Sequence, residues 1–196
     1  MIAAEASNAS PIITAFTHIL PLSEKEIQDF TQITKEEKLS KGQFWVKENK
    51  RNERIGFLID GYLRKFYIDN SGKEITDAFY FSSDFCTELP SIIGNTAPSS
   101  YIIAMEETSI ITFSYADFDR LRIKYPRFER IYSRFLEHTF LKFYNRTTSF
   151  IQRTPKERYA ELLKSNPIIF QKAAQYHIAS YLGVSYQHLS RLRSVR

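Results

Sequence analysis

The stretch His177-Ile178-Ala179-Ser180-Tyr181-Leu182-Gly183-Val184-Ser185-Tyr186-Gln187-His188-Leu189-Ser190-Arg191-Leu192 decides the fold of the C-terminal part of this chain. It predicts a helix-turn-helix, because Ala179 is small where two helices touch and Gly183 permits a tight turn between them. The apolar positions that form the shared core are Ile178, Leu182, Val184, Leu189 and Leu192. A plain helical hairpin is the alternative interpretation.

The second helix of this stretch carries polar and basic side chains on its opening turns. Ser185 is placed to cap the helix, which leaves the following polar residues on or near its exposed side. Such side chains are what a helix needs to read the major groove of DNA. The residues expected to bind DNA are Ser185, Tyr186, Gln187, His188, Ser190 and Arg191. Of these, we expect Tyr186, Gln187 and Arg191 at base edges, with Ser185 and His188 nearer the phosphates.

The charge distribution agrees with a polyanionic partner for the C-terminal part. The net charge of the 196 residues is only +5, but residues 153–196 carry 8 basic and 2 acidic side chains. Residues 115–196 carry 16 basic against 6 acidic side chains, whereas residues 1–114 carry 11 against 16. This asymmetry indicates two functional parts, the second of which faces a polyanion.

A long helix is predicted immediately before this tail. Residues 127–152 contain neither Gly nor Pro and are rich in Phe and Tyr, which is more aromatic surface than a solvent-facing helix needs. About 26 residues at roughly 1.5 Å each span nearly 40 Å, more than one small domain covers. We therefore expect a subunit interface, with a long core helix as the alternative. Thr154-Pro155-Lys156-Glu157 has the form of a helix start and marks the boundary after residue 152.

The preceding residues predict a β-rich domain. From about Glu36 to Phe113, short apolar runs alternate with turn signals such as Asp60-Gly61 and Asn70-Ser71-Gly72. This pattern is typical of an antiparallel sandwich or barrel. Short helices are expected after Pro21 and over Tyr115–Leu121, so the fold class is α+β.

In this order of elements the chain resembles the Crp/Fnr family of bacterial transcription regulators. The similar stretches are Pro21-Leu22-Ser23, Gly61-Tyr62-Leu63-Arg64, Asp69 to Thr76, Lys156-Glu157-Arg158-Tyr159 and Ile178 to Val184. The resemblance implies a sensor β-roll of the jelly-roll type in residues 1–126, a dimerisation helix in 127–152 and a helix-turn-helix DNA-binding domain in 153–196. It further implies a homodimer on double-stranded DNA, contact with RNA polymerase, and a winged-helix tail. The sequence given ends almost directly after the second helix, without the wing.

The resemblance also locates an effector pocket, at Glu88, Leu89, Ser99 and Ser100. Cyclic-nucleotide-binding members use a Gly-Glu pair at the ribose and an Arg-Ser or Arg-Thr pair at the phosphate. Here Thr87 precedes Glu88, and Pro98 stands where the Arg is expected. A buried cyclic phosphate without that Arg would lack a charge partner, which is costly. Cyclic AMP is therefore not expected, the effector is unknown, and Glu88 is either a pocket remnant or a solvated carboxylate.

Other functions find little support in the residues. Cys86 is alone, so neither an internal disulfide nor a multi-thiolate metal site is expected, and a small buried residue is the simplest interpretation. The four His residues lack metal-ligand spacing, and no catalytic motif is present, so neither enzymatic activity nor a cofactor is expected. No signal peptide and no membrane-spanning run is found, which favours the cytoplasm. The rival function is a sensor or protein-interaction module of the cyclic-nucleotide-binding type that does not bind DNA.

Overall fold

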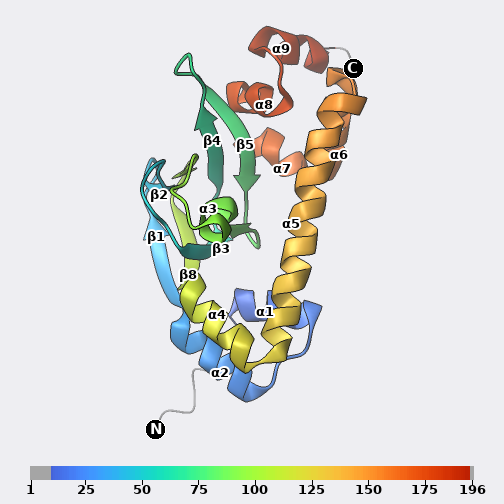
Figure 1. Ribbon diagram of the computed structural model, residues 1–196. Helices are drawn as coiled ribbons and strands as arrows, with labels where there is room; N and C mark the ends of the chain where they lie inside the picture. Colours follow the sequence, from blue (N-terminus) through green and yellow to red (C-terminus); the bar gives the residue numbers. More distant parts are fainter. Residues whose placement is uncertain (1–9, 195–196) are drawn as a thin grey trace. The chain divides into compact units, whose positions relative to one another are not determined.

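The computed structural model describes residues 10–194 and confirms the α+β class (Figure 1). The strands are β1 (Lys35–Leu39), β2 (Phe44–Val46), β3 (Arg54–Asp60), β4 (Leu63–Ile68), β5 (Glu74–Tyr80), β6 (Phe85–Cys86), β7 (Tyr101–Ala104) and β8 (Thr108–Ser114). The helices are α1 (Pro11–Ile19), α2 (Glu24–Ile33), α3 (Leu89–Gly94), α4 (Tyr115–Lys124), α5 (Pro126–Gln152), α6 (Pro155–Ser165), α7 (Pro167–Lys172), α8 (Gln175–Leu182) and α9 (Tyr186–Ser194).

The strands form two four-stranded sheets, as the alternating apolar runs and turns predict. Their strand orders are β1-β8-β3-β6 and β2-β7-β4-β5. In the first sheet β8 pairs antiparallel with both β1 and β3, with Ile55 opposite Phe113. Apart from the β4–β5 hairpin, neighbouring strands are far apart in the sequence, which is typical of a rolled sandwich rather than a simple meander.

Two compact units can be distinguished by their internal contacts. The first unit comprises the described residues up to Leu63 together with Tyr80–Glu137. The second comprises Arg64–Phe79 and the described residues from His138 onward. The hairpin formed by β4 and β5 therefore belongs with the C-terminal helices, which the sequence does not predict. The functional division into residues 1–126, 127–152 and 153–196 stays a prediction. Its first and last segments include residues 1–9 and 195–196, which lie outside the described residues.

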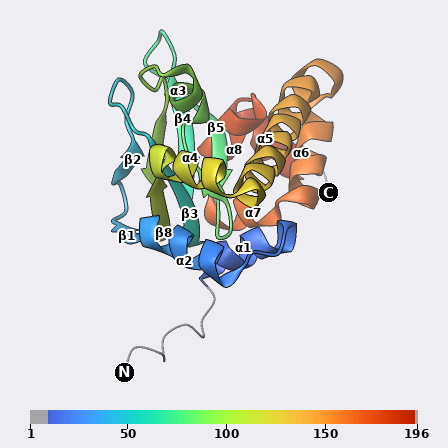
Figure 2. The same cartoon turned by 60° about the horizontal axis from the view of Figure 1, so that its bottom comes forward.

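The core of the first unit is aromatic. Helices α1, α2 and α4 gather with the beginning of α5 (Figure 2). Phe30 and Phe128 are completely buried there, with their ring centroids 5.7 Å apart. Phe16 and Phe118 pack against both of them. Burial of such rings supplies both apolar area and edge-to-face contacts, which fix how these helices pack.

The predicted helix starts are confirmed, and three short helices are additions. Ser23 and Thr154 each form a reciprocal capping box with the Glu three residues later. The sequence pattern did not predict α1, α3 or α7. In α7 the same proline that ends α6 occupies the first turn of a new helix, where its missing N–H costs nothing.

Candidate nucleic-acid interface

The predicted helix-turn-helix is present as α8, a turn and α9. Gly183 follows α8 in the left-handed conformation, with φ of 68°. Val184 N–H then donates to the carbonyl of Ala179 at 3.0 Å, which closes the turn. The buried residues of this motif are Ile178, Ala179, Leu182 and Leu189, whereas Val184 and Leu192 of the expected core are half-buried. The alternative of an unrelated helical hairpin does not explain why the turn and core positions coincide with this motif.

Two arginines hold the C-terminal end of α8. Arg146 donates from Nη1 to the carbonyl of Tyr181 at 3.1 Å, and Arg158 donates from Nε and Nη2 to the carbonyl of Leu182 at 3.2 and 3.0 Å. The last carbonyls of a helix lack intrahelical donors and carry partial negative charge, so a guanidinium there is favourable. Phe150 packs beneath both arginines, with its ring centroid 5.2 Å and 4.7 Å from their guanidinium carbons.

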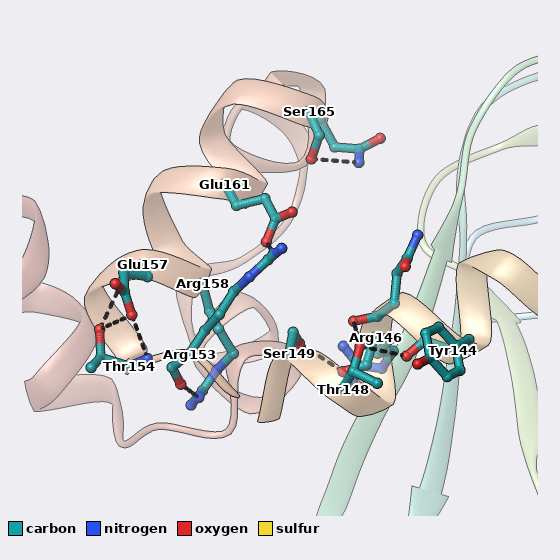
Figure 3. Close-up of polar contacts among 12 residues, drawn as sticks. Tyr144, Arg146, Thr148, Ser149, Arg153, Thr154, Glu157, Arg158, Glu161 and Ser165 are labelled. Atoms are coloured by element: carbon teal, nitrogen blue, oxygen red, sulfur yellow. Dashed lines mark hydrogen bonds and ion pairs between the residues drawn. The ribbon is translucent and has the colours of Figure 1, made fainter. Parts of the chain in front are cut away.

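The joint between α5 and α6 is tied by polar contacts that Figure 3 draws. The hydroxyl of Thr154 accepts from Glu157 N–H at 3.3 Å, and the carboxylate of Glu157 accepts from Thr154 N–H at 2.8 Å. Arg153 pairs with Glu161, and Arg158 donates to the carbonyl of Arg153 at 2.8 Å. These contacts fix α6, and through Arg158 they fix the turn of the helix-turn-helix.

The six residues expected to bind DNA lie at and after the start of α9. Ser185 accepts from His188 N–H at 3.1 Å, as a capping residue does. Gln187, Ser190 and Arg191 are exposed, and Tyr186 is 52% exposed. His188 is half-buried. Gln187 and Arg191 are four residues apart and therefore lie on one face of α9. Their exposure leaves them available to a partner, and their roles at base edges stay predictions.

Hairpin residues that the sequence did not single out as functional also contact α8. Thr76 N–H donates to Ser180 Oγ at 2.9 Å. Arg64 Nη1 lies 2.7 Å from His177 Nδ1. The only signal in the sequence was that Arg64 and Thr76 fall in stretches that carry the family resemblance. Periodicity cannot show such a contact, because it joins residues more than 100 positions apart.

The aromatic face expected along the whole of α5 is exposed only in its second half. Phe128, Ile131 and Tyr132 are buried in the core of the first unit, and Phe135 and Leu136 pack against it. For the first third of the helix the alternative of a core helix is therefore correct. The exposed apolar side chains are Phe140 at 64%, Leu141 at 54%, Phe143 at 67%, Tyr144 at 53%, Phe150 at 41% and Ile151 at 80%.

In the expected effector pocket, Glu88 is a buried carboxylate with partners inside the chain. Only 2% of Glu88 is exposed, so the interpretation as a solvated carboxylate is wrong. Its Oε2 accepts from Ser91 N–H at 3.0 Å, which caps α3, and its Oε1 accepts from Ser100 Oγ at 3.3 Å. Leu89 is half-buried and Ser99 is exposed. The structure thus brings Glu88 and Ser100 together, while Ser99 faces solvent.

The structure also bears on the reactivity of Cys86, on metal binding and on membrane-spanning helices. Cys86 is completely buried, and burial raises the pKa of its thiol far above the ordinary value, so it behaves as a small apolar residue. Within residues 10–194, no cluster of three or more His, Cys, Asp or Glu side chains is arranged to hold a metal ion. None of the described helices combines the length and apolar character that a membrane span requires.

Comparisons with known proteins agree with this architecture. Residues 36–125 match the cyclic nucleotide-binding domain family. FixK2 from Bradyrhizobium japonicum superposes with a TM-score of 0.71 at 15% identity, over 83% of each chain. The c-di-GMP responsive global regulator CLP from Xanthomonas campestris gives 0.68 at 12% identity, over 88% of this chain and 90% of that one. The chain has a Crp/Fnr-type fold.

A third structure of this type is a CooA mutant from Carboxydothermus hydrogenoformans. It superposes with a TM-score of 0.66 at 18% identity, over 84% of this chain and 77% of that one. No curated protein sequence matches the chain. The resemblance noted in the sequence is thereby confirmed for the fold, from the Crp/Fnr-type β-roll through the long helix to the helix-turn-helix.

Proposed function

We propose that this chain is a transcription regulator that binds double-stranded DNA as a homodimer. The observation that carries the proposal is the exposed face of α9. Gln187 and Arg191 are exposed on this helix, whereas Leu189 is buried and packs the helix onto its neighbours. Arg pairs with guanine through two acceptors and Gln pairs with adenine, and each such contact contributes roughly 1–3 kcal/mol of discrimination. The basic excess of the tail adds attraction to phosphates.

The homodimer in this proposal rests on the second half of α5. Phe140, Tyr144, Thr147 and Ile151 follow one another at spacings of four, three and four residues, which is the seam of a coiled coil. All four are exposed. Two such helices packed together would bury the apolar strip. A two-fold dimer presents two α9 helices to an inverted repeat whose half-sites lie about 34 Å apart.

The effector in this proposal is a ligand other than cyclic AMP. Both carboxylate oxygens of Glu88 accept hydrogen bonds within the chain, and Pro98 brings no charge to the place where a phosphate needs one. Contact with RNA polymerase is a further part of the proposal that rests on the fold alone. The role is regulatory, and we infer no enzymatic activity.

Selection of bound duplexes from a random DNA pool, followed by binding curves, tests the proposal. An inverted repeat is expected, with affinity that falls steeply as salt rises, because bound phosphates release their counterions. Replacing Arg191 by Ala should relax sequence preference at one symmetric pair of positions. Arg193→Ala is the matched control, since it removes the same charge from another side of α9.

Two outcomes would contradict the proposal. If no duplex is enriched and binding to a partner protein shows little salt dependence, the chain is the protein-interaction module considered as its rival. If Arg191→Ala weakens selected and scrambled duplexes by the same factor, Arg191 contacts the backbone and α9 docks differently.

A further inference from the structure

A buried polar network joins the β4–β5 hairpin to α8 inside the second unit. Arg64 is only 3% exposed, and its guanidinium contacts His177 Nδ1 at 2.7 Å, Thr76 Oγ1 at 3.2 Å and the carboxylate of Glu74. Thr76 N–H donates to Ser180 Oγ, which in turn donates to the carbonyl of Glu74 at 3.3 Å. The hairpin therefore grips the first helix of the helix-turn-helix at two of its residues.

The contact between Arg64 and His177 imposes a protonation state. A guanidinium has only donors and stays charged in proteins, so Nδ1 of His177 must accept the hydrogen bond with its lone pair. The imidazole is then neutral and carries its proton on Nε2. Protonation of Nδ1 would place two donors and two positive charges 2.7 Å apart in a site that is 5% exposed. The contact and the protonated imidazole exclude each other.

Burial and the charge of Arg64 both oppose protonation of His177, and Glu74 acts against them. Burial is the main cause that lowers the pKa of His177, to about 4, and the positive charge of Arg64 from β4 lowers it further. Glu74 from β5 opposes this effect, but 47% of its side chain is exposed and water screens it. The ring of Tyr176, the preceding residue on α8, packs against the imidazole with its centroid 4.0 Å from that of His177.

We propose that the Arg64–His177 contact makes the β4–β5 hairpin a latch on α8 that protonation of the imidazole releases. The direction of the pH dependence follows from the linkage between protonation of His177 and formation of the contact. The latched state favours neutral His177, so the latch is at full strength above the ordinary imidazole pKa of about 6.5 and weakens as the pH falls toward 4. From these two values the latch is about thirtyfold weaker at pH 5 than at pH 7.5. Any effect of the latch on DNA binding rests on the proposed function, but the latch itself does not.

Hydrogen exchange on the full chain without DNA tests the latch. The amide of Thr76 reports its opening, because that N–H donates to Ser180 across the contact. We expect its protection, corrected for intrinsic exchange, to fall about thirtyfold between pH 7.5 and pH 5. The amide of Val184 closes the turn of the helix-turn-helix itself and should keep its protection. Equal loss at Val184 would mean that the motif unfolds in acid, which overturns the latch.

The matched variant is His177→Gln. The amide oxygen of Gln can accept from Arg64 but does not titrate, so protection of Thr76 should no longer depend on pH. A fall in H177Q equal to that of the wild type would overturn the proposal. An NMR titration that measures the pKa of His177 in the wild type is a second test and needs no variant. Titration of His177 near 6.5 instead of near 4 would show that no latch opposes its protonation.

Discussion

At the scale of single residues, the helix-turn-helix depends on backbone freedom at Gly183. Its φ is 68°, and a Cβ built there would lie 2.8 Å from Cε1 of Phe150. Phe150 in turn contacts the guanidinium groups of Arg146 and Arg158, which bind the last carbonyls of α8. A side chain at position 183 would therefore disturb the turn and the arginines that fix it.

Gly183→Ala is expected to destabilise the second unit by about 2–4 kcal/mol. About 1 kcal/mol comes from the left-handed backbone and the rest from the clash with Phe150. Gly72→Ala is the matched control in the same unit, because Gly72 also has a positive φ but no atom lies within 4 Å of its Cβ position. Thermal unfolding measures both variants. Equal losses of stability would contradict the clash with Phe150.

Cyclic AMP is expected not to bind with low-micromolar affinity. Pro98 offers neither charge nor donor, and Glu88 is already used by Ser91 and Ser100. An unpaired cyclic phosphate buried in this pocket would be costly. Calorimetric titration of the full chain with cyclic AMP is the measurement. Saturable binding heat at low-micromolar cyclic AMP would contradict this prediction. It would mean that the phosphate is bound by residues other than those at the expected position.

At the scale of elements, α5 changes character along its length. Its first turns belong to an aromatic core, whereas its second half exposes Phe140, Tyr144 and Ile151 on one face. The ring centroids of Phe140 and Tyr144 lie 6.1 Å apart in a stacked arrangement, so the two side chains form one continuous apolar strip. Large exposed apolar side chains in register mark an interaction face.

Phe140→Glu is expected to weaken the homodimer at least tenfold, because a carboxylate in the seam loses both apolar contact and hydration. Sedimentation over a concentration series measures the dissociation constant. His138→Glu is the matched control, since His138 is exposed on the opposite side of α5. A monomeric wild type at micromolar concentration, or equal effects of the two variants, would contradict dimerisation through this face. Phe135 is unsuitable for this test because it packs on Phe85 and Tyr132.

At the scale of the whole molecule, the sequence predicts what depends on neighbours along the chain. The helix starts at Ser23 and Thr154, the turn at Gly183 and the cap at Ser185 follow from local hydrogen bonding and backbone geometry. The burial of Glu88 and the pairing of Arg64 with His177 depend on residues 12 and 113 positions away. Periodicity and turn signals carry no information about such contacts. The same limit applies to α5, where only tertiary packing decides which half is covered.

Because the β4–β5 hairpin groups with the C-terminal helices, a chimaera that exchanges the C-terminal part has to exchange the hairpin as well. The second unit is discontinuous in sequence, since 58 residues separate Arg64–Phe79 from the segment that begins at His138. A chimaera that exchanges only the residues after 152 keeps the guanidinium of Arg64 but takes away the imidazole and the hydroxyl that α8 presents to the hairpin. Grafts that move the hairpin together with the tail preserve those partners and are the ones to build.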